Sequence, residues 1–400
     1  MLKKYYCFLI FIFLISGCAT VRHAVPAGLL NKVTIYDMRD IRTLSGLPSD
    51  SFKKDFLKLL EQEEKGGPSF FDFKNSRTYS MLTISGGAAN GAYGAGLLSG
   101  WSKSGTRPEF RVVTGISTGA IIAPFAFLGS KYDDKLKEIS TKYSTKDIIC
   151  IRSPRLAIPF KDSIASTKPL ESLIERYFDK ELLKEIAVEY NKGRRLYIGT
   201  TNLDAQRLVI WDMGKIASYG DDKALKLFRK IILASASIPI AFPPVYFEAK
   251  IDDKIYDEMH VDGGVVRQVF FLYDVLQGID KAMKEKGLDA SRMHYKIYII
   301  RNGYVDAVWQ EVPDKLSAIA GRAVDTMINA QSIGDIYQLY TFTQLGRGDF
   351  NLAYIPATYV AKGKELFDPV EMRTLFDLGF KEAANGYPWK KTPPGLGTGN

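Results

Sequence analysis

The residues best suited to chemistry lie around Ser117, which stands between two glycines in the stretch Gly115-Ile116-Ser117-Thr118-Gly119. Short apolar runs precede and follow this stretch. The order predicts a strand, a sharp turn and a helix, the arrangement of a nucleophile elbow that exposes a serine hydroxyl. Glycines at the two flanking positions allow the backbone to turn tightly and the helix to pack closely. Because G-x-S-x-G also occurs by chance, the motif alone does not establish a nucleophile.

A second glycine-rich turn lies about 30 residues before the elbow. The strand expected at residues 79–84 leads into Ser85-Gly86-Gly87-Ala88-Ala89-Asn90-Gly91 and then into a helix. Such a turn presents free backbone N–H groups that can hold a phosphate or an oxyanion. It fits neither the glycine spacing of a dinucleotide site nor a Walker A loop, which needs Gly-Lys-Ser/Thr. One strand–helix–strand crossover separates the two turns, so both should meet at one sheet edge, where an oxyanion hole would serve Ser117.

A serine nucleophile needs a base, and the chain contains only three histidines. His23 lies in the N-terminal segment. His260 lies in a predicted strand, where a packed side chain is the commoner role. His294 could complete a Ser–Asp–His triad with Ser117 and Asp262, but it precedes a predicted strand, whereas a triad histidine usually follows one. We therefore interpret His294 as a surface residue and keep the triad as an alternative.

Asp262 is the remaining candidate for the base. It shares a strand face with His260, and Gly263-Gly264 forms a tight turn directly after it. A carboxylate is a weak base for a hydroxyl, so it must be aligned and desolvated to act. The alternative is a turn-forming aspartate, which is common before glycines.

Together these motifs resemble the patatin-like phospholipases. The ordered motifs are Ser85-Gly86-Gly87-x-x-x-Gly91, Gly115-Ile116-Ser117-Thr118-Gly119 and Asp262-Gly263-Gly264. The resemblance runs from about Tyr79 to at least Arg267 and includes Gly199-Thr200-Thr201-Asn202-Leu203-Asp204, Ala234-Ser235-Ala236-Ser237-Ile238-Pro239 and Phe242-Pro243-Pro244. Each motif alone is weak, but three in order are specific.

The resemblance implies a three-layer α/β/α fold with a mainly parallel central sheet. It implies a Ser117–Asp262 dyad in which Ser117 accepts the acyl group and Asp262 is the general base. The backbone amides of Gly86, Gly87 and Ala88 would bind the oxyanion. The substrate would be a phospholipid or another lipid ester, with neither metal nor cofactor.

Two positions depart from the family's usual Gly-Gly-Gly-x-Arg/Lys-Gly turn. Ala88 replaces the third glycine, and Asn90 replaces the basic residue. Backbone donors survive an alanine, so we expect the oxyanion hole to be intact. Loss of the basic residue removes a positive charge near the site.

The N-terminus has the features of an export signal. Lys3 and Lys4 precede a short apolar core, Cys7 to Ile15, and Leu14-Ile15-Ser16-Gly17-Cys18 resembles a bacterial lipobox. The resemblance implies cleavage after residues 1–17 and a lipid on the sulfur of Cys18, which would anchor the protein to a membrane surface. Ala19 favours the outer membrane in a host with two membranes. An ordinary signal peptide is the alternative.

The remaining chain divides by composition. We expect a tether and surface segment at 18–76, one acyl hydrolase domain at 77–390, and a flexible tail at 391–400. Within the domain we expect strands at 295–300 and 350–359 and helices at 318–331 and 369–385, while 151–168 could form a lid. Periodicity over 50–65 indicates an amphipathic helix that packs on the core.

The net charge and the composition restrict the possible classes of function. Removing residues 1–17 changes the net charge from +9 to 52 − 45 = +7, and no basic block interleaved with aromatic residues indicates a nucleic-acid site. Two functions remain: an envelope-anchored lipid acyl hydrolase, or a non-catalytic envelope lipoprotein that binds lipid or protein.

Overall fold

The computed structural model describes residues 22–47, 49, 51–55, 78–151, 163, 165–271, 294–345 and 348–396. These residues build one mixed sheet of ten strands and a separate two-stranded ribbon. The strands of the main sheet are β1 (Thr34–Ile35), β2 (Arg42–Leu44), β3 (Thr78–Ile84), β4 (Val112–Ile116), β7 (Arg195–Asn202), β8 (Arg207–Asp212), β9 (Val245–Ile251), β10 (Lys254–Asp262), β11 (His294–Arg301) and β12 (Gly348–Tyr354). The ribbon pairs β5 (Cys150–Ile151) with β6 (Ala165–Ser166).

Five neighbouring strands run parallel in the order β7-β4-β3-β11-β12, and β10, β9, β1, β8 and β2 extend the sheet in antiparallel pairs. Parallel neighbours end at the same edge, and the register places Ile84 of β3 opposite Gly115 of β4. The glycine-rich turn and the elbow, which follow these two strands, are therefore adjacent. This confirms the expected three-layer α/β fold, although only five of the ten described strands form the parallel part and the sheet is mixed.

Strand β10 meets the end of β4 along one edge of β7. Strand β8 pairs with β7 from Tyr197 to Asn202 and so occupies one of its two edges. On the other edge, β4 pairs up to Ile116 opposite Gly199, and β10 then takes over with Asp262 opposite Thr200. The last residue of β10 consequently lies beside the residue that follows β4, which is Ser117.

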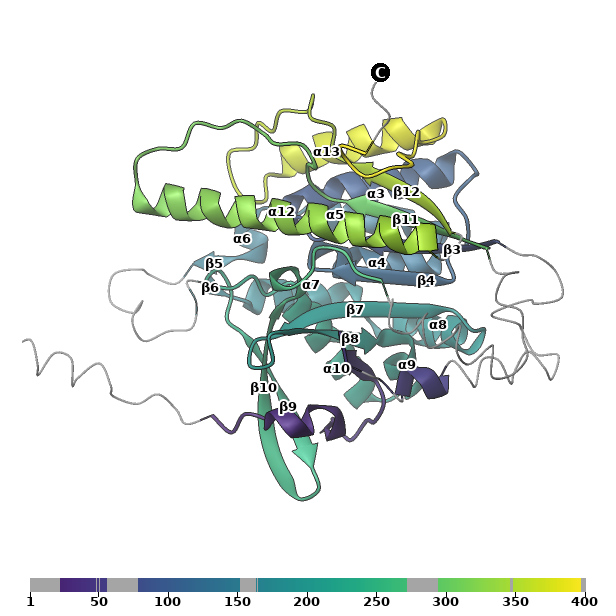
Figure 1. The fold of residues 1–400 in the computed structure, drawn as a ribbon, viewed down its shortest axis with the longest axis vertical. Coiled ribbons are helices and arrows are strands. Elements are labelled where there is room, and N and C mark those ends of the chain that lie inside the picture. Colours follow the sequence, from purple (N-terminus) through teal and green to yellow (C-terminus); the bar gives the residue numbers. More distant parts are fainter. Residues whose placement is uncertain are drawn as a thin grey trace, which may run out of the picture.

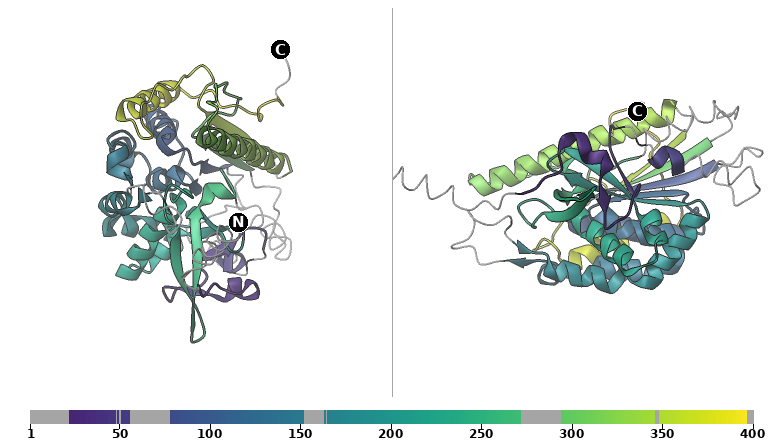
Figure 2. Two further views of the ribbon diagram at one scale, coloured as in Figure 1. Left: turned by 90° about the vertical axis from the view of Figure 1, so that its left-hand side faces the viewer. Right: turned by 90° about the horizontal axis from the view of Figure 1, so that it is seen from below.

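Helices cover both faces of the sheet (Figures 1 and 2). One face carries most of them, and the right-hand view of Figure 2 shows α12 on the other. The described helices are α3 (Gly91–Lys103), α4 (Thr118–Leu128), α5 (Asp133–Thr141), α6 (Thr145–Ile148), α7 (Lys168–Tyr177), α8 (Lys180–Asn191), α9 (Met213–Ser218), α10 (Asp222–Ser235), α12 (Leu316–Leu345) and α13 (Pro369–Ala384), with short 3-10 turns at Ala27–Lys32, Ala88–Asn90, Ser130–Tyr132 and Gly263–Val265. None of these helices has both the length and the apolar composition needed to cross a bilayer.

Two apolar cores hold these layers together. The larger lies between the sheet and the helices of the crowded face. The smaller includes Ile297 of β11, Phe350 of β12, and Leu339 and Phe342 from the second half of α12. The first half of α12 projects beyond the body (Figure 1), and Leu316 at its start is 86% exposed. The helix is about twice as long as the expected 318–331 because its buried face begins only at Ser332.

The N-terminal segment is part of the fold, which corrects the expectation of a tether over its described residues. Strand β1 pairs with β9 and β2 pairs with β8, and Ile35 and Ile41 are buried. Further along, Phe52 is buried and stacks on Tyr197, so the described start of the expected amphipathic helix packs on the core. Strands of two or three residues carry too little periodicity to be recognised in a sequence.

The expected tail also begins later than residue 391. The Lys391 ammonium donates to Asn351 Oδ1, and the carbonyl of Pro394 accepts a hydrogen bond from Tyr337. The signal segment 1–17, Cys18, most of the possible lid at 151–168 and residues 397–400 lie outside the described residues.

Candidate active site

Ser117 occupies a strained turn between β4 and α4. Its backbone has φ 57° and ψ −126°, a conformation that L-residues rarely adopt and that costs of the order of 1–3 kcal/mol. A Cβ on Gly119 would lie 2.2 Å from the carbonyl oxygen of Ile84, so only glycine allows this approach of α4 to β3. The predicted elbow is therefore present in the geometry, with Ser117 at the start of α4 and 6% exposed.

Asp262 lies next to Ser117, close enough for the Ser117 hydroxyl to lower the pKa of its carboxyl. Its Oδ1 accepts the N–H of Gly264 at 2.7 Å, and its own backbone N–H donates to the carbonyl of Ser237 at 2.9 Å. Both ends of the aspartate are thus fixed by backbone contacts. The structure brings together the two side chains that the sequence placed 145 positions apart.

Burial raises the pKa of Asp262 to about 6, although the hydrogen bonds from Ser117 and the Gly264 amide oppose this shift. No described cation forms an ion pair with the carboxylate, which is 5% exposed. Removal from water disfavours the charged form, so this carboxyl is a stronger proton acceptor than an ordinary aspartate. It titrates in the range in which a general base can both take up and release a proton.

The glycine-rich turn lies against the nucleophile. A Cβ on Gly86 would be 2.9 Å from Ser117 Cβ and 3.4 Å from its Oγ, and the Thr118 hydroxyl donates to the carbonyl of Ala88 at 3.0 Å. Within the described part of the chain, the amides of Gly86, Gly87 and Ala88 donate to no protein acceptor. Ala88 adopts φ 49°, a left-handed conformation that the family's usual glycine would reach at lower cost.

An apolar cavity opens at Ser117 and runs between the helices of the crowded face. It holds about 810 Å³ of non-protein space, including open solvent at its mouth. Its polar groups are few and include the Ser117 and Thr118 hydroxyls at one end. The apolar lining comes mainly from Ala92, Ile121, Ile122, Ile139, Ile148, Leu170, Leu173, Ile174, Phe178, Phe242, Phe367 and Met372.

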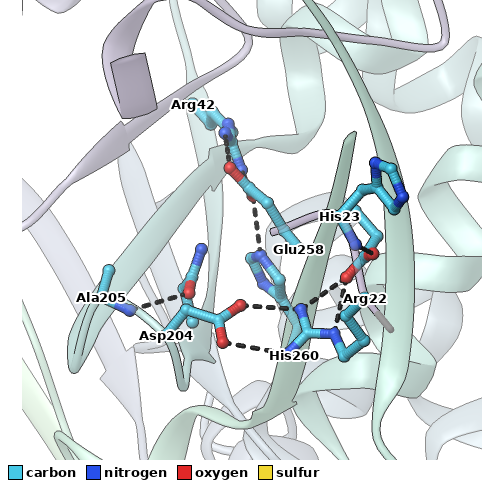
Figure 3. A network of polar contacts seen from close by, with 9 residues as sticks. Arg22, His23, Arg42, Asp204, Ala205, Glu258 and His260 are labelled. Carbon is cyan, nitrogen blue, oxygen red and sulfur yellow. Dashed lines mark hydrogen bonds and ion pairs between the residues drawn. The ribbon is translucent and has the colours of Figure 1, made fainter. Parts of the chain in front are cut away.

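His260, two residues before Asp262, belongs to a separate buried network (Figure 3). Its Nε2 lies 3.0 Å from Glu258 and its Nδ1 lies 2.8 Å from the Thr200 hydroxyl. Arg42 forms an ion pair with Glu258. With the His260 proton on Nε2, each donor in this network has an acceptor. Burial lowers the pKa of His260 although Glu258 opposes the shift. Its ring nitrogens are occupied, so it is not available to Ser117.

His294 lies at the opposite edge of the sheet from Ser117. It begins β11 opposite Thr78, the first residue of β3, whereas the glycine-rich turn follows the last residue of that strand. Seven residues of strand separate the two edges by roughly 20 Å. Its Nε2 is 3.4 Å from Asp349. The Ser–Asp–His triad is therefore wrong as an alternative for this structure.

Sequence reasoning missed the residues that hold the site. The Ser235 hydroxyl accepts the backbone N–H of Ser117 at 3.0 Å and donates to the carbonyl of Gly199 at 2.7 Å. Asp335 of α12 binds the segment after Asp262 through Arg267 and the amide of Gln268, each at 2.7 Å. Ser235 lies in a stretch that resembles the patatin-like family, but nothing in the sequence placed α12 near Asp262.

Among the described residues, no group of three or more His, Cys, Asp and Glu side chains is arranged as a metal site.

One family model and two solved structures are similar to parts of this chain. Residues 82–274 match the family model of the patatin-like phospholipases. The crystal structure of VipD from Legionella pneumophila shares 12% identity with a TM-score of 0.35, covering 76% of this chain and 67% of that one. A structure of the SpcU–ExoU complex from Pseudomonas aeruginosa shares 15% identity with a TM-score of 0.28, covering 77% of this chain and 53% of that one. No curated protein sequence matches the chain.

The family match includes all three motifs of the site: the glycine-rich turn, the elbow and the Asp-Gly-Gly turn. It leaves out the N-terminal strands, β11, α12 and β12, which complete the sheet around the matched region. The chain therefore carries, at residues 82–274, a domain of the patatin-like phospholipase family.

Proposed function

We propose that the protein is a serine acyl-ester hydrolase that cleaves lipid esters through a Ser117–Asp262 dyad. The observation that carries this proposal is the contact of a strained serine with a buried, unpaired carboxylate at the end of an apolar cavity. The unoccupied amides of the Gly86–Ala88 turn supply donors for an oxyanion. The family of the domain supports lipid esters as the substrate class.

In the proposed reaction, Asp262 accepts the Ser117 hydroxyl proton as Oγ attacks the ester carbonyl. The carbonyl oxygen becomes an oxyanion, which the amides of Gly86, Gly87 and Ala88 bind. Protonated Asp262 then gives its proton to the leaving alcohol, and the acyl group stays on Ser117. Water attacks this acyl-enzyme, Asp262 takes the water proton, and the carboxylic acid and free Ser117 are released.

The cavity fits the acyl chain of such a substrate. Its polar end at Ser117 would hold the ester, and its apolar walls would remove the hydrocarbon from water at about 25 cal/mol per Å² buried. Ile238 lines the cavity and is also partly exposed. Ile240 and Leu366, which lie close in the chain to the lining residues Ile238 and Phe367, are exposed as well. This rim would contact other hydrocarbon when the substrate lies in a lipid aggregate.

Envelope location is a further part of the proposal. Lipid on Cys18 would leave only residues 19–21 before Arg22, which binds Asp204 and Asp257 through its guanidinium. Such a link reaches at most about 14 Å, so the domain would be held close to the membrane surface.

A lipid-ester panel on three proteins tests this function. Purified wild type, Ser117→Ala and Asp262→Asn are assayed on phospholipid vesicles and on p-nitrophenyl esters from butyrate to palmitate. Ser172→Ala is the matched control, because its hydroxyl is exposed on α7 and binds only the carbonyl of Lys168. We expect ester cleavage by wild type and the control and none by the two site variants.

A variant that fills the cavity tests the acyl-chain assignment. Leu173→Trp should slow cleavage of palmitate esters more than butyrate esters because it shortens the apolar space. Wild-type protein that binds vesicles and cleaves no ester would favour the non-catalytic lipoprotein.

A further inference from the structure

Arg301 is a buried cation without an acidic partner. It ends β11 and is 6% exposed, and no described carboxylate lies within 4.0 Å of its guanidinium. Its Nε has no hydrogen-bond partner among the described residues. Burial lowers the pKa of Arg301 to about 10, with Asp335 opposing the shift from a distance. A guanidinium buried in this way destabilises a fold, so its position calls for a reason other than packing.

The guanidinium lies on the glycine-rich turn. Its Nη1 donates to the Ser85 hydroxyl oxygen and to the carbonyl of Gly86, both at 3.3 Å. The Ser85 hydroxyl itself donates to the carbonyl of Gly86 at 2.6 Å and accepts the amide of Asn302 at 2.8 Å. The Asn302 side chain also binds the carbonyl of Ser85 at 2.9 Å. Two consecutive residues of β11 and its following loop thus hold the start of the turn.

These contacts orient one peptide unit. The carbonyl of Gly86 and the N–H of Gly87 belong to the same planar group and point in opposite directions. A donor pair that holds this carbonyl therefore directs the Gly87 N–H to the other side of the plane. A cation at the carbonyl also polarises the peptide and makes its N–H a stronger donor. The amide of Gly87 has no protein acceptor in the described structure and is one of the proposed oxyanion donors.

We propose that Arg301 is a positioning residue of the oxyanion hole, which orients the Gly86–Gly87 peptide and supplies the positive charge that Asn90 does not. The role rests on the proposed hydrolase function. Arg301 would act on the oxyanion intermediate through the Gly86–Gly87 peptide and through its own positive charge, because the guanidinium contacts the carbonyl side of the turn. Loss of Arg301 should then slow the chemical step and leave substrate binding in the cavity unchanged.

The test compares Arg301→Gln and Arg301→Lys with wild type on a soluble butyrate ester. Misplacing an oxyanion donor costs up to about 100-fold, so we expect Arg301→Gln to lower kcat about 10- to 100-fold with little change in KM. Arg301→Lys keeps the charge but not the planar guanidinium that places Nη1 against both Ser85 and Gly86, and it should recover part of the loss.

Arg194→Gln is the matched control. Arg194 is equally buried and donates to the carbonyls of Phe110 and Phe127, but it forms an ion pair with Glu189 and precedes β7 at the far edge of the sheet. Only Arg301→Gln should lose kcat, and thermal unfolding of both Gln variants shows whether each is folded at the assay temperature. Arg301→Gln with wild-type kcat would overturn the role of Arg301.

Two further outcomes keep the result decisive. If Arg301→Gln does not fold, Arg301→Lys decides: a kcat about threefold or more below wild type supports the role, and an unchanged kcat overturns it. If wild type itself cleaves no ester while remaining folded, the proposed function fails, and this outcome is distinct from a failure confined to the Arg301 variants.

Discussion

Two buried polar clusters lie two residues apart on β10, and they differ in how their charges are balanced. At His260, the imidazole, the Glu258 carboxylate and the Arg42 guanidinium satisfy one another (Figure 3). The Thr200 hydroxyl completes the network. At Asp262, the carboxylate lies beside the Ser117 hydroxyl and accepts one backbone amide, and it pairs with no cation among the described residues. The first cluster faces Trp211 and Phe247, whereas Ser117 in the second opens into the cavity.

The pKa values follow this difference. Although burial pushes the pKa of Glu258 upward, Arg42 and His260 hold it well below the usual range. Burial without a neighbouring cation raises the pKa of Asp262 to about 6. A histidine is thus a structural residue here and an aspartate the candidate base, the reverse of what residue type alone favours. Charge compensation and access to a cavity separate the two roles.

The largest expected effect is the loss of ester cleavage in Ser117→Ala and Asp262→Asn. Each removes one member of the dyad, so kcat should fall at least about 10³-fold. Assays on a soluble ester measure this loss. Activity of Asp262→Asn within tenfold of wild type would mean that Asp262 is not the base.

Asp262→Asn should also stabilise the fold above pH 6. The pKa of the Asp262 carboxyl rises from 3.8 to about 6 on folding, so the folded state binds more protons than the unfolded state between these pH values. The free energy of unfolding therefore falls as the pH rises through this range. The full cost is about 3 kcal/mol. Urea unfolding at pH 8 should show this gain in the variant and a smaller one at pH 5.

The next effect falls on stability and spares activity. Arg42→Met leaves Glu258 buried and uncompensated, which should cost about 3–5 kcal/mol of unfolding free energy. Folded variant should keep a kcat close to wild type, because this network does not touch Ser117. Arg39→Met, an exposed neighbour, controls for lost surface charge. A collapse of kcat in fully folded Arg42→Met would erase the distinction between the clusters.

The titration of Asp262 should make kcat/KM depend on pH. Only the ionised carboxylate can accept the Ser117 proton, so kcat/KM should fall about tenfold for each unit below pH 6. The pH profile on a soluble ester measures this limb. His260 should add no limb of its own, since its pKa is lowered and its nitrogens are paired. If the acidic limb of the kcat/KM profile shifted in His260→Asn and persisted in Asp262→Asn, the titrating group would be His260 and not Asp262.

The smallest effect is expected for His294→Ala. This side chain is partly exposed at the far edge of the sheet, near Asp349. Removing it should change kcat/KM less than twofold and stability by less than about 0.5 kcal/mol. A large loss of activity would restore the triad that the topology excludes.

The motifs of the candidate site could be predicted from sequence because their geometry is local. The glycines around Ser117, the turn after residue 84 and the Asp-Gly-Gly turn each specify a backbone shape within a few residues. The long-range prediction that the two turns share a sheet edge followed from crossover length and is confirmed by the register of β3 and β4.

The supports of the site could not be predicted, because they depend on contacts between distant segments. Arg301 and Asp335 act on turns more than 60 positions away in the chain, and β2 pairs with a strand about 165 residues later. The N-terminal segment was misjudged as a tether for this reason: its strands are short, and their partners give them stability.

The account depends most directly on Ser117 being a nucleophile activated by Asp262. A fluorophosphonate probe followed by peptide mass spectrometry locates the reactive residue and measures its rate of labelling. We predict an adduct on Ser117 in wild type and at least about 100-fold slower labelling in Asp262→Asn. An adduct on another residue, or equal labelling rates in the two proteins, would contradict the account.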